Sequence, residues 1–174
     1  MSSVPIALAA LAALAVPLAA AAVASSPGTR NVSCNESIGT TRFPYLGNSE
    51  PRYRSRLVLR TASAPPAYLR EVVATHEHPW RYWRKAGLVI RAGAGRLTVT
   101  VPKEWRARAA ITWGNGGKGG FSSVRFAGCG SNPNSGIAYA GGFYLASPSA
   151  CLPLVFRVGT HTATVRFGIG QRCR

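Results

Sequence analysis

The last third of the chain alternates apolar and polar residues with the period of a β-strand. In 152–158 the apolar residues Leu152, Leu154, Phe156 and Val158 fall on one face, with Arg157 between the last two. In 163–169 the apolar residues Ala163, Val165, Phe167 and Ile169 alternate with Thr164, Arg166 and Gly168. Gly159 and Thr160 lie between the two segments, and glycine tolerates the positive φ of a tight turn. The pattern therefore predicts a β-hairpin.

Shorter runs with the same alternation continue upstream, separated by Gly, Pro, Ser or Asn. We expect strands at 54–60, 69–74, 86–92, 96–101, 107–113, 121–127 and 136–145. Gly93-Ala94-Gly95 predicts a second hairpin between 86–92 and 96–101. Gly141-Gly142 predicts a bulge or a close backbone approach, and the alternative is that these glycines expose backbone to a ligand. No segment keeps a helical period. About eight or nine short strands at intervals of about ten residues are typical of an antiparallel β-sandwich.

The first 24 residues have the pattern of a secretory signal peptide. Val4 to Ala24 is an apolar run that ends in Ala22-Val23-Ala24, a small-x-small cleavage site. We expect cleavage after Ala24, export to the cell envelope or the medium, and no transmembrane span in the rest of the chain. The alternative is an uncleaved membrane anchor, because a run of about 20 apolar residues can cross a bilayer.

The remaining residues have the length of one domain. Residues 25–50 lack strong periodicity, so we expect an irregular lead-in there. The sandwich domain is expected at 51–174, and we expect it to be monomeric.

Four cysteines, Cys34, Cys129, Cys151 and Cys173, favour two disulfides in an exported chain. They can pair in three ways. We favour Cys129–Cys151 as a local link and Cys34–Cys173 as a tie between the ends of the domain, because each cysteine adjoins a predicted strand edge. No two cysteines have the C-x-x-C spacing that favours a zinc site.

The segments RFAGC, AYAGGF, CLPLVFRV and VRFGIGQRC, in that order, resemble the C-terminal half of a family of small secreted proteins of high-GC Gram-positive bacteria. The resemblance covers about the last fifty residues well and the region from Cys34 to Thr112 loosely. That family has no known activity, cofactor or catalytic residue. The resemblance therefore implies secretion and the extent of the domain, but no mechanism.

The formal charge of +16 comes from 21 basic and five acidic residues. Such a charge attracts polyanions such as nucleic acid, wall teichoic acids or anionic lipid headgroups. The alternative is that the arginines only reflect a GC-rich genome, since they are scattered along the chain. The sequence holds no specific nucleic-acid motif.

Trp80, Arg81, Tyr82, Trp83, Arg84 and Lys85 form the candidate binding segment. Aromatic rings interleaved with cations can stack on bases or sugars while the cations meet phosphates. The alternative is that the tryptophans close the end of the sandwich while the cations stay in water.

His76 and His78 form the candidate metal site, because alternate residues of an extended segment point to the same side. Glu71 and His161 are the candidates to join them. The alternative is an exposed polar loop without metal.

Catalysis is not expected. The sequence contains no aspartate, which excludes a Ser-His-Asp triad, and it has no G-x-S-x-G turn. The glycines of 114–120 lack the Lys-Ser/Thr ending of a phosphate-binding loop, so they predict a hairpin connection. We expect a non-catalytic binding module for envelope polyanions or glycans, without a cofactor. A metal-binding protein and a structural domain without a specific ligand remain the alternatives.

Overall fold

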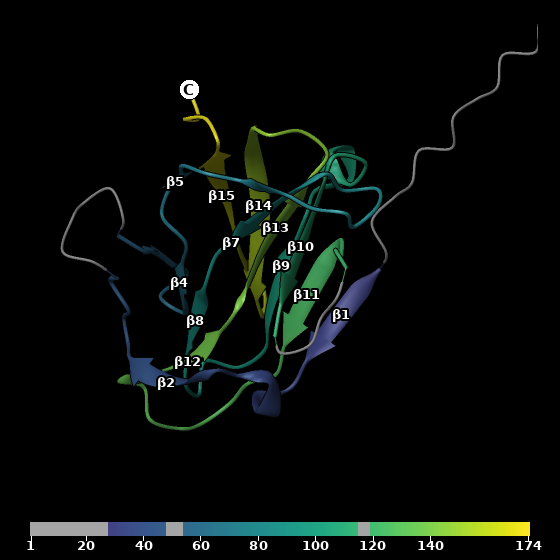
Figure 1. Ribbon diagram of the computed structural model, residues 1–174. Helices are drawn as coiled ribbons and strands as arrows, with labels where there is room; N and C mark the ends of the chain where they lie inside the picture. Colours follow the sequence, from purple (N-terminus) through teal and green to yellow (C-terminus); the bar gives the residue numbers. More distant parts are fainter. Residues whose placement is uncertain (1–27, 48–53, 115–118) are drawn as a thin grey trace, which may run out of the picture.

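The computed structural model describes residues 28–47, 54–114 and 119–174 (Figure 1). The expected signal peptide and most of the glycine-rich segment 114–120 lie outside the described residues. No described helix is long and apolar enough to cross a membrane. The described residues form fifteen strands and two short 3-10 helices, more strands than the eight or nine expected, because several are only two or three residues long.

The strands form three sheets, which we name A, B and D. Sheet A contains, in spatial order, β1 (Thr29–Val32), β11 (Ser123–Phe126), β9 (Leu97–Thr100), β14 (Ala150–Val158), β15 (His161–Ile169) and β5 (Tyr68–Leu69). Sheet B contains β2 (Gly39–Arg42), β12 (Ser135–Tyr139), β8 (Leu88–Arg91), β4 (Ala62–Ala64) and β3 (Arg56–Val58). Sheet D contains β10 (Ala109–Trp113), β13 (Gly141–Leu145), β7 (Tyr82–Lys85) and β6 (Val73–Ala74). Most pairs are antiparallel, but β1 pairs with β11 and β5 with β15 in parallel.

Sheet A packs against sheets B and D across one hydrophobic core. Ring contacts join the layers: Phe126 of β11 lies 4.9 Å from Tyr139 of β12, and Phe167 of β15 lies 5.6 Å from Phe143 of β13, both measured between ring centroids. All four rings are buried. The expected all-β sandwich is confirmed.

The predicted C-terminal hairpin is confirmed. Strands β14 and β15 pair from Ala150 opposite Ile169 to Val158 opposite His161. Of the four apolar side chains of β14 that were expected on one face, Leu152, Leu154 and Phe156 are fully buried and Val158 is half-buried.

The second expected hairpin is wrong. Strand β8 pairs with β4 and β12 in sheet B, whereas β9 pairs with β11 and β14 in sheet A. Residues 92–96 therefore carry the chain from one layer of the sandwich to the other. The alternation within 96–101 places Leu97, Val99 and Val101 on one face of the strand, and all three are fully buried.

Gly141 and Gly142 lie where the chain leaves sheet B and enters sheet D. A Cβ atom at Gly141 would collide with the main-chain oxygen of Thr112, and one at Gly142 with that of Arg84. The expected close backbone approach is therefore confirmed, and it brings β10 and β7 onto the two sides of β13.

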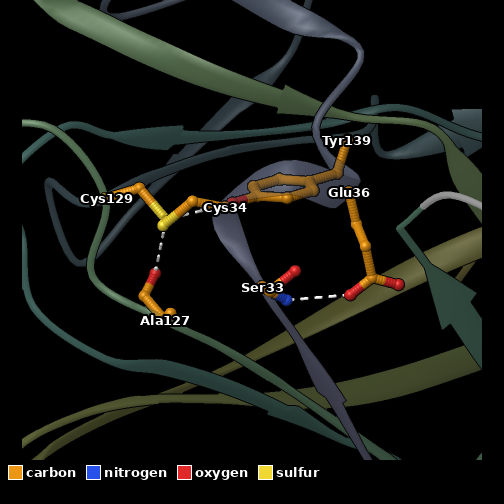
Figure 2. The surroundings of a disulfide bond; sticks show 6 residues. All are labelled: Ser33, Cys34, Glu36, Ala127, Cys129 and Tyr139. Atoms are coloured by element: carbon orange, nitrogen blue, oxygen red, sulfur yellow. Dashed lines mark hydrogen bonds between the residues drawn. A yellow bond between two sulfur atoms is a disulfide. The ribbon is translucent and has the colours of Figure 1, made fainter.

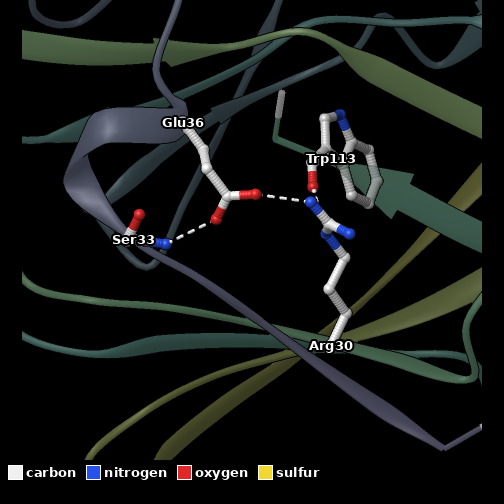
Figure 3. A network of polar contacts seen from close by, with 4 residues as sticks. All are labelled: Arg30, Ser33, Glu36 and Trp113. Carbon is white, nitrogen blue, oxygen red and sulfur yellow. Dashed lines mark hydrogen bonds and ion pairs between the residues drawn. The ribbon is translucent and has the colours of Figure 1, made fainter. Parts of the chain in front are cut away.

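The expected irregular lead-in is wrong for two of its segments, because β1 joins sheet A and β2 joins sheet B. A 3-10 helix, η1 (Cys34–Glu36), connects them. Figure 3 shows how this region is held: Arg30 forms an ion pair with Glu36, and its Nε donates to the main-chain oxygen of Trp113 at 3.2 Å. The other carboxylate oxygen of Glu36 accepts the main-chain N–H of Ser33 at 2.8 Å.

All four cysteines form disulfides, but the favoured pairing is wrong. The bonds are Cys34–Cys129 and Cys151–Cys173. Strands β1 and β11 run in parallel, and the main-chain N–H of Ala127 donates to the oxygen of Val32 at 3.1 Å. The residues that follow the two strands therefore lie side by side, and Cys34 meets Cys129 beside the ring of Tyr139 (Figure 2).

The second disulfide depends on a glycine. Cys151 of β14 lies opposite Gly168 of β15. The chain folds back after β15, so that a Cβ atom at Gly168 would lie 3.0 Å from the main-chain nitrogen of Cys173. The missing side chain thus lets Cys173 return to the strand pair and reach Cys151.

Candidate functional site

The predicted binding segment is divided among different environments. Trp80 is 2% exposed and forms a small cluster with Ala110 and Tyr144 on the face of sheet D that points away from the main core. Trp83 packs against this cluster, with its ring centroid 4.5 Å from that of Tyr144. The two tryptophans therefore cover apolar surface on this face of sheet D. Ligand binding by the segment stays a prediction.

The other four residues of the segment separate according to strand alternation. Tyr82 packs against the main core, whereas Arg81 and Lys85 are exposed. Arg84 lies opposite the buried Phe143 and is itself half-buried. The segment does not present a continuous row of rings and cations to the solvent.

His76 and His78 are exposed, as a polar loop would place them. In residues 28–47, 54–114 and 119–174, no three His, Cys, Asp or Glu side chains gather closely enough to hold a metal ion. The expectation that Glu71 and His161 join the pair is therefore wrong. Metal binding by the two histidines alone stays a prediction.

The structure brings together a different set of residues on the outer face of sheet A. They surround an open hollow of about 540 Å³, which we call the basic groove. The groove is lined by Arg56, Ala67, Tyr68, Thr164, Arg166, Arg172 and Cys173.

Strand alternation orients the groove residues. Thr164 and Arg166 alternate with the buried Val165 and Phe167 of β15, so they point away from the core. Tyr68 precedes the buried Leu69 on β5, which pairs with the end of β15. The pairing of β5 with β15 therefore places the ring of Tyr68 and the cation of Arg166 along the same edge of sheet A.

Two further contacts fix the arginines. Nη1 of Arg56, from the edge strand β3 of sheet B, donates to the main-chain oxygen of Arg166 at 2.9 Å. The guanidinium carbon of Arg172 lies 5.2 Å from the ring centroid of Tyr68, within cation–π distance. The folded-back tail that the Cys151–Cys173 disulfide secures thus also supplies the third arginine.

A second hollow, of about 450 Å³, continues the groove across β14 and β15. It shares Thr164 and Arg166 with the basic groove and ends at Trp105 and Glu104 of the 3-10 helix η3 (Lys103–Trp105). The guanidinium carbon of Arg108 lies 4.2 Å from the Trp105 ring centroid. An elongated ligand would therefore pass from one aromatic ring to another, with Arg166 between them.

The electrostatics of the basic groove favour anions. Arg56, Arg166 and Arg172 are exposed, and none of them forms an ion pair with a carboxylate of the described residues. Arginine presents a planar fork of donors that matches the oxygens of phosphate and carboxylate groups. The arrangement can therefore hold an anionic chain.

Sequence reasoning missed this site because its members are far apart in the chain. Arg56, Tyr68 and Arg166 come from three strands, and Arg172 follows the last of them. The available signal was the outward position of Thr164 and Arg166 in the predicted hairpin.

Comparisons with protein-family models, with curated protein sequences and with solved structures find no match to this chain.

Proposed function

We propose that this protein is a secreted, non-catalytic binding module that holds anionic polymers of the cell envelope in its basic groove. The observation that carries the proposal is the convergence of Arg56, Arg166 and Arg172 on one hollow without a carboxylate partner among the described residues. Cations left unpaired at a surface are available to an external anion, and each can exchange weakly held counterions for a phosphate.

The rest of the molecule agrees with this function. The net charge of +16 draws polyanions toward the protein from a distance. The two disulfides suit an oxidising compartment outside the cytoplasm, where the target polymers lie. The apolar signal-like segment 4–24 supports export, and the resemblance to small secreted proteins agrees with it.

The polymer class follows from the shape of the site. The groove and its continuation are open hollows, so they suit a chain that passes through and continues at both ends. Repeated phosphate groups would meet the arginine forks, and sugar or polyol units between them would lie along Tyr68 and Trp105. A phosphate-linked polyol or glycan is therefore the target that we favour.

The proposal is tested by co-sedimentation of the oxidised protein with teichoic-acid-bearing cell walls. The comparison is a triple variant, Arg56→Gln, Arg166→Gln and Arg172→Gln. We expect the wild type to be retained and the variant to be retained at least ten-fold more weakly. A matched control removes the same charge from exposed arginines outside the groove, Arg42→Gln, Arg96→Gln and Arg125→Gln. Equal losses in the two triple variants would show that net charge, and not the groove, causes retention.

A further inference from the structure

A separate hollow of about 470 Å³ lies where β7 of sheet D meets β4 and β8 of sheet B. We call it the Arg84 pocket. It shares no lining residue with the basic groove. Its volume is within the range of small-molecule binding sites.

The cationic side of the pocket is formed by Arg84 and Lys85. Arg84 lies on the core side of β7, opposite Phe143, and its Nε atom is buried without a hydrogen-bond acceptor among the described residues. A buried donor without an acceptor is destabilising, so most such groups in folded proteins are paired. Among the residues that the structure describes, no carboxylate lines the pocket.

The opposite side of the pocket is apolar. Pro65, Pro66, Leu69 and Ala86 line it, and all but the half-buried Pro66 are buried. The hydroxyl-bearing Ser55 and Ser63 also belong to the lining. One end thus suits an anionic group, whereas the body of the pocket suits a short hydrocarbon or aromatic group.

We propose that the Arg84 pocket binds a small organic anion, with its carboxylate or phosphate on Arg84 and Lys85 and its apolar body against Pro66 and Leu69. The half-buried position of Arg84 lowers the cost of binding, because part of its hydration is already lost in the free protein. An anion on its terminal nitrogens then gains a charge-assisted hydrogen bond at a site with little competing water. This site is independent of the polymer-binding groove.

The test is calorimetric titration of the oxidised protein with benzoate, phenyl phosphate and the uncharged benzyl alcohol. We expect saturable one-to-one binding of at least one anion and none of benzyl alcohol. The anion that binds more tightly shows whether the pocket prefers a carboxylate or a phosphate. Arg84→Met should weaken that binding at least ten-fold without lowering the midpoint of thermal unfolding, because it removes the buried Nε donor that has no acceptor among the described residues and keeps a side chain of similar length.

Three variants serve as controls. Arg81→Gln removes one charge from an exposed position that does not line the pocket and should bind as the wild type does. The triple variant of the basic groove should also bind normally, which separates this site from the proposed function. Arg84→Lys keeps the charge but loses the fork, and it should bind more weakly than the wild type even if Arg84→Met does not fold. The proposal is overturned if the wild type binds neither anion saturably, or if the Arg84 variants bind with unchanged affinity.

Discussion

Arg56 donates a hydrogen bond from Nη1 to the main-chain oxygen of Arg166, which lies 110 residues later in the chain. The bond joins the edge of sheet B to β15 of sheet A and holds two cations beside one hollow. Like charges at a surface repel each other, so the two arginines raise the electrostatic energy of the free protein. An anion that binds between them relieves this repulsion. The relationship is the structural basis of the proposed polymer site.

The two disulfides should stabilise the fold to different extents. Cys34–Cys129 closes a loop with a sequence separation of 95, and Cys151–Cys173 one of 22. Loop-closure entropy gives about 5 kcal/mol for the first and about 3 kcal/mol for the second. Urea denaturation of Cys34→Ala/Cys129→Ala and of Cys151→Ala/Cys173→Ala measures both losses. An equal or reversed order would contradict the loop-closure explanation.

The Cys151–Cys173 disulfide should also affect polymer binding in the basic groove. Its removal frees the tail that carries Arg172, so polymer binding should weaken even where the protein remains folded. Removal of Cys34–Cys129, which lies at the ends of β1 and β11, should leave binding by the folded fraction unchanged. Binding assays on the two double variants, under conditions where each is folded, test this difference.

Gly120 should not tolerate a side chain. A Cβ atom there would collide with the Cβ of Ala110 and would lie 3.0 Å from Nε1 of Trp80 and 3.2 Å from a ring carbon of Tyr144. Gly120→Ala should therefore lower the free energy of unfolding by about 1–3 kcal/mol, as overpacking does. Gly87→Ala is the matched control, since its Cβ atom would have its nearest neighbour at 3.9 Å. Equal stability of the two variants in urea denaturation would exclude the close packing described for Gly120.

Stability should fall at alkaline pH through buried tyrosines. Burial raises the pKa of the Tyr139 hydroxyl above its usual 10.0, and the carboxylate of Glu36 raises it further. The folded protein therefore favours the neutral phenol, while the unfolded chain ionises near pH 10. The contribution of Tyr139 to the free energy of unfolding is fully present below about pH 10 and is lost as the pH rises through the raised pKa.

Urea denaturation across this pH range measures the effect. Tyr139→Phe keeps the ring that packs against Phe126 and should show a weaker dependence on pH. Burial also raises the pKa of Tyr144, so some dependence should remain in the variant. An unchanged pH dependence in Tyr139→Phe would contradict a role for this hydroxyl.

Local patterns predicted the features that depend on neighbouring residues. The hairpin of β14 and β15 follows from alternation around Gly159, because its two strands are adjacent in the chain. The sheet partners of β8 and β9 could not be predicted in this way. A short glycine connection can join two strands of one hairpin, or it can carry the chain from one sheet to the other. The burial of Leu97 and Val99 was correct even though their sheet partners were not.

The disulfide pairing and the basic groove depend on long-range register. Cys34 meets Cys129 because β1 and β11 are parallel neighbours, which no spacing in the sequence reveals. Arg56, Arg166 and Arg172 likewise appear scattered until β3, β5 and β15 are placed beside one another. The role of segment 80–85 could not be deduced from its local composition, because strand alternation divides its residues among different environments.

The most direct test of the basic groove is the salt dependence of its affinity for a long-chain inorganic polyphosphate. The slope of log Kd against log salt concentration counts the counterions that phosphate contacts release, at roughly 0.7–0.9 per contact. We expect the triple variant of Arg56, Arg166 and Arg172 to have a slope smaller than that of the wild type by roughly 2–3. The control triple variant of Arg42, Arg96 and Arg125 should keep nearly the full slope. Equal slopes for the wild type and the groove variant would contradict the assignment of polymer binding to the groove.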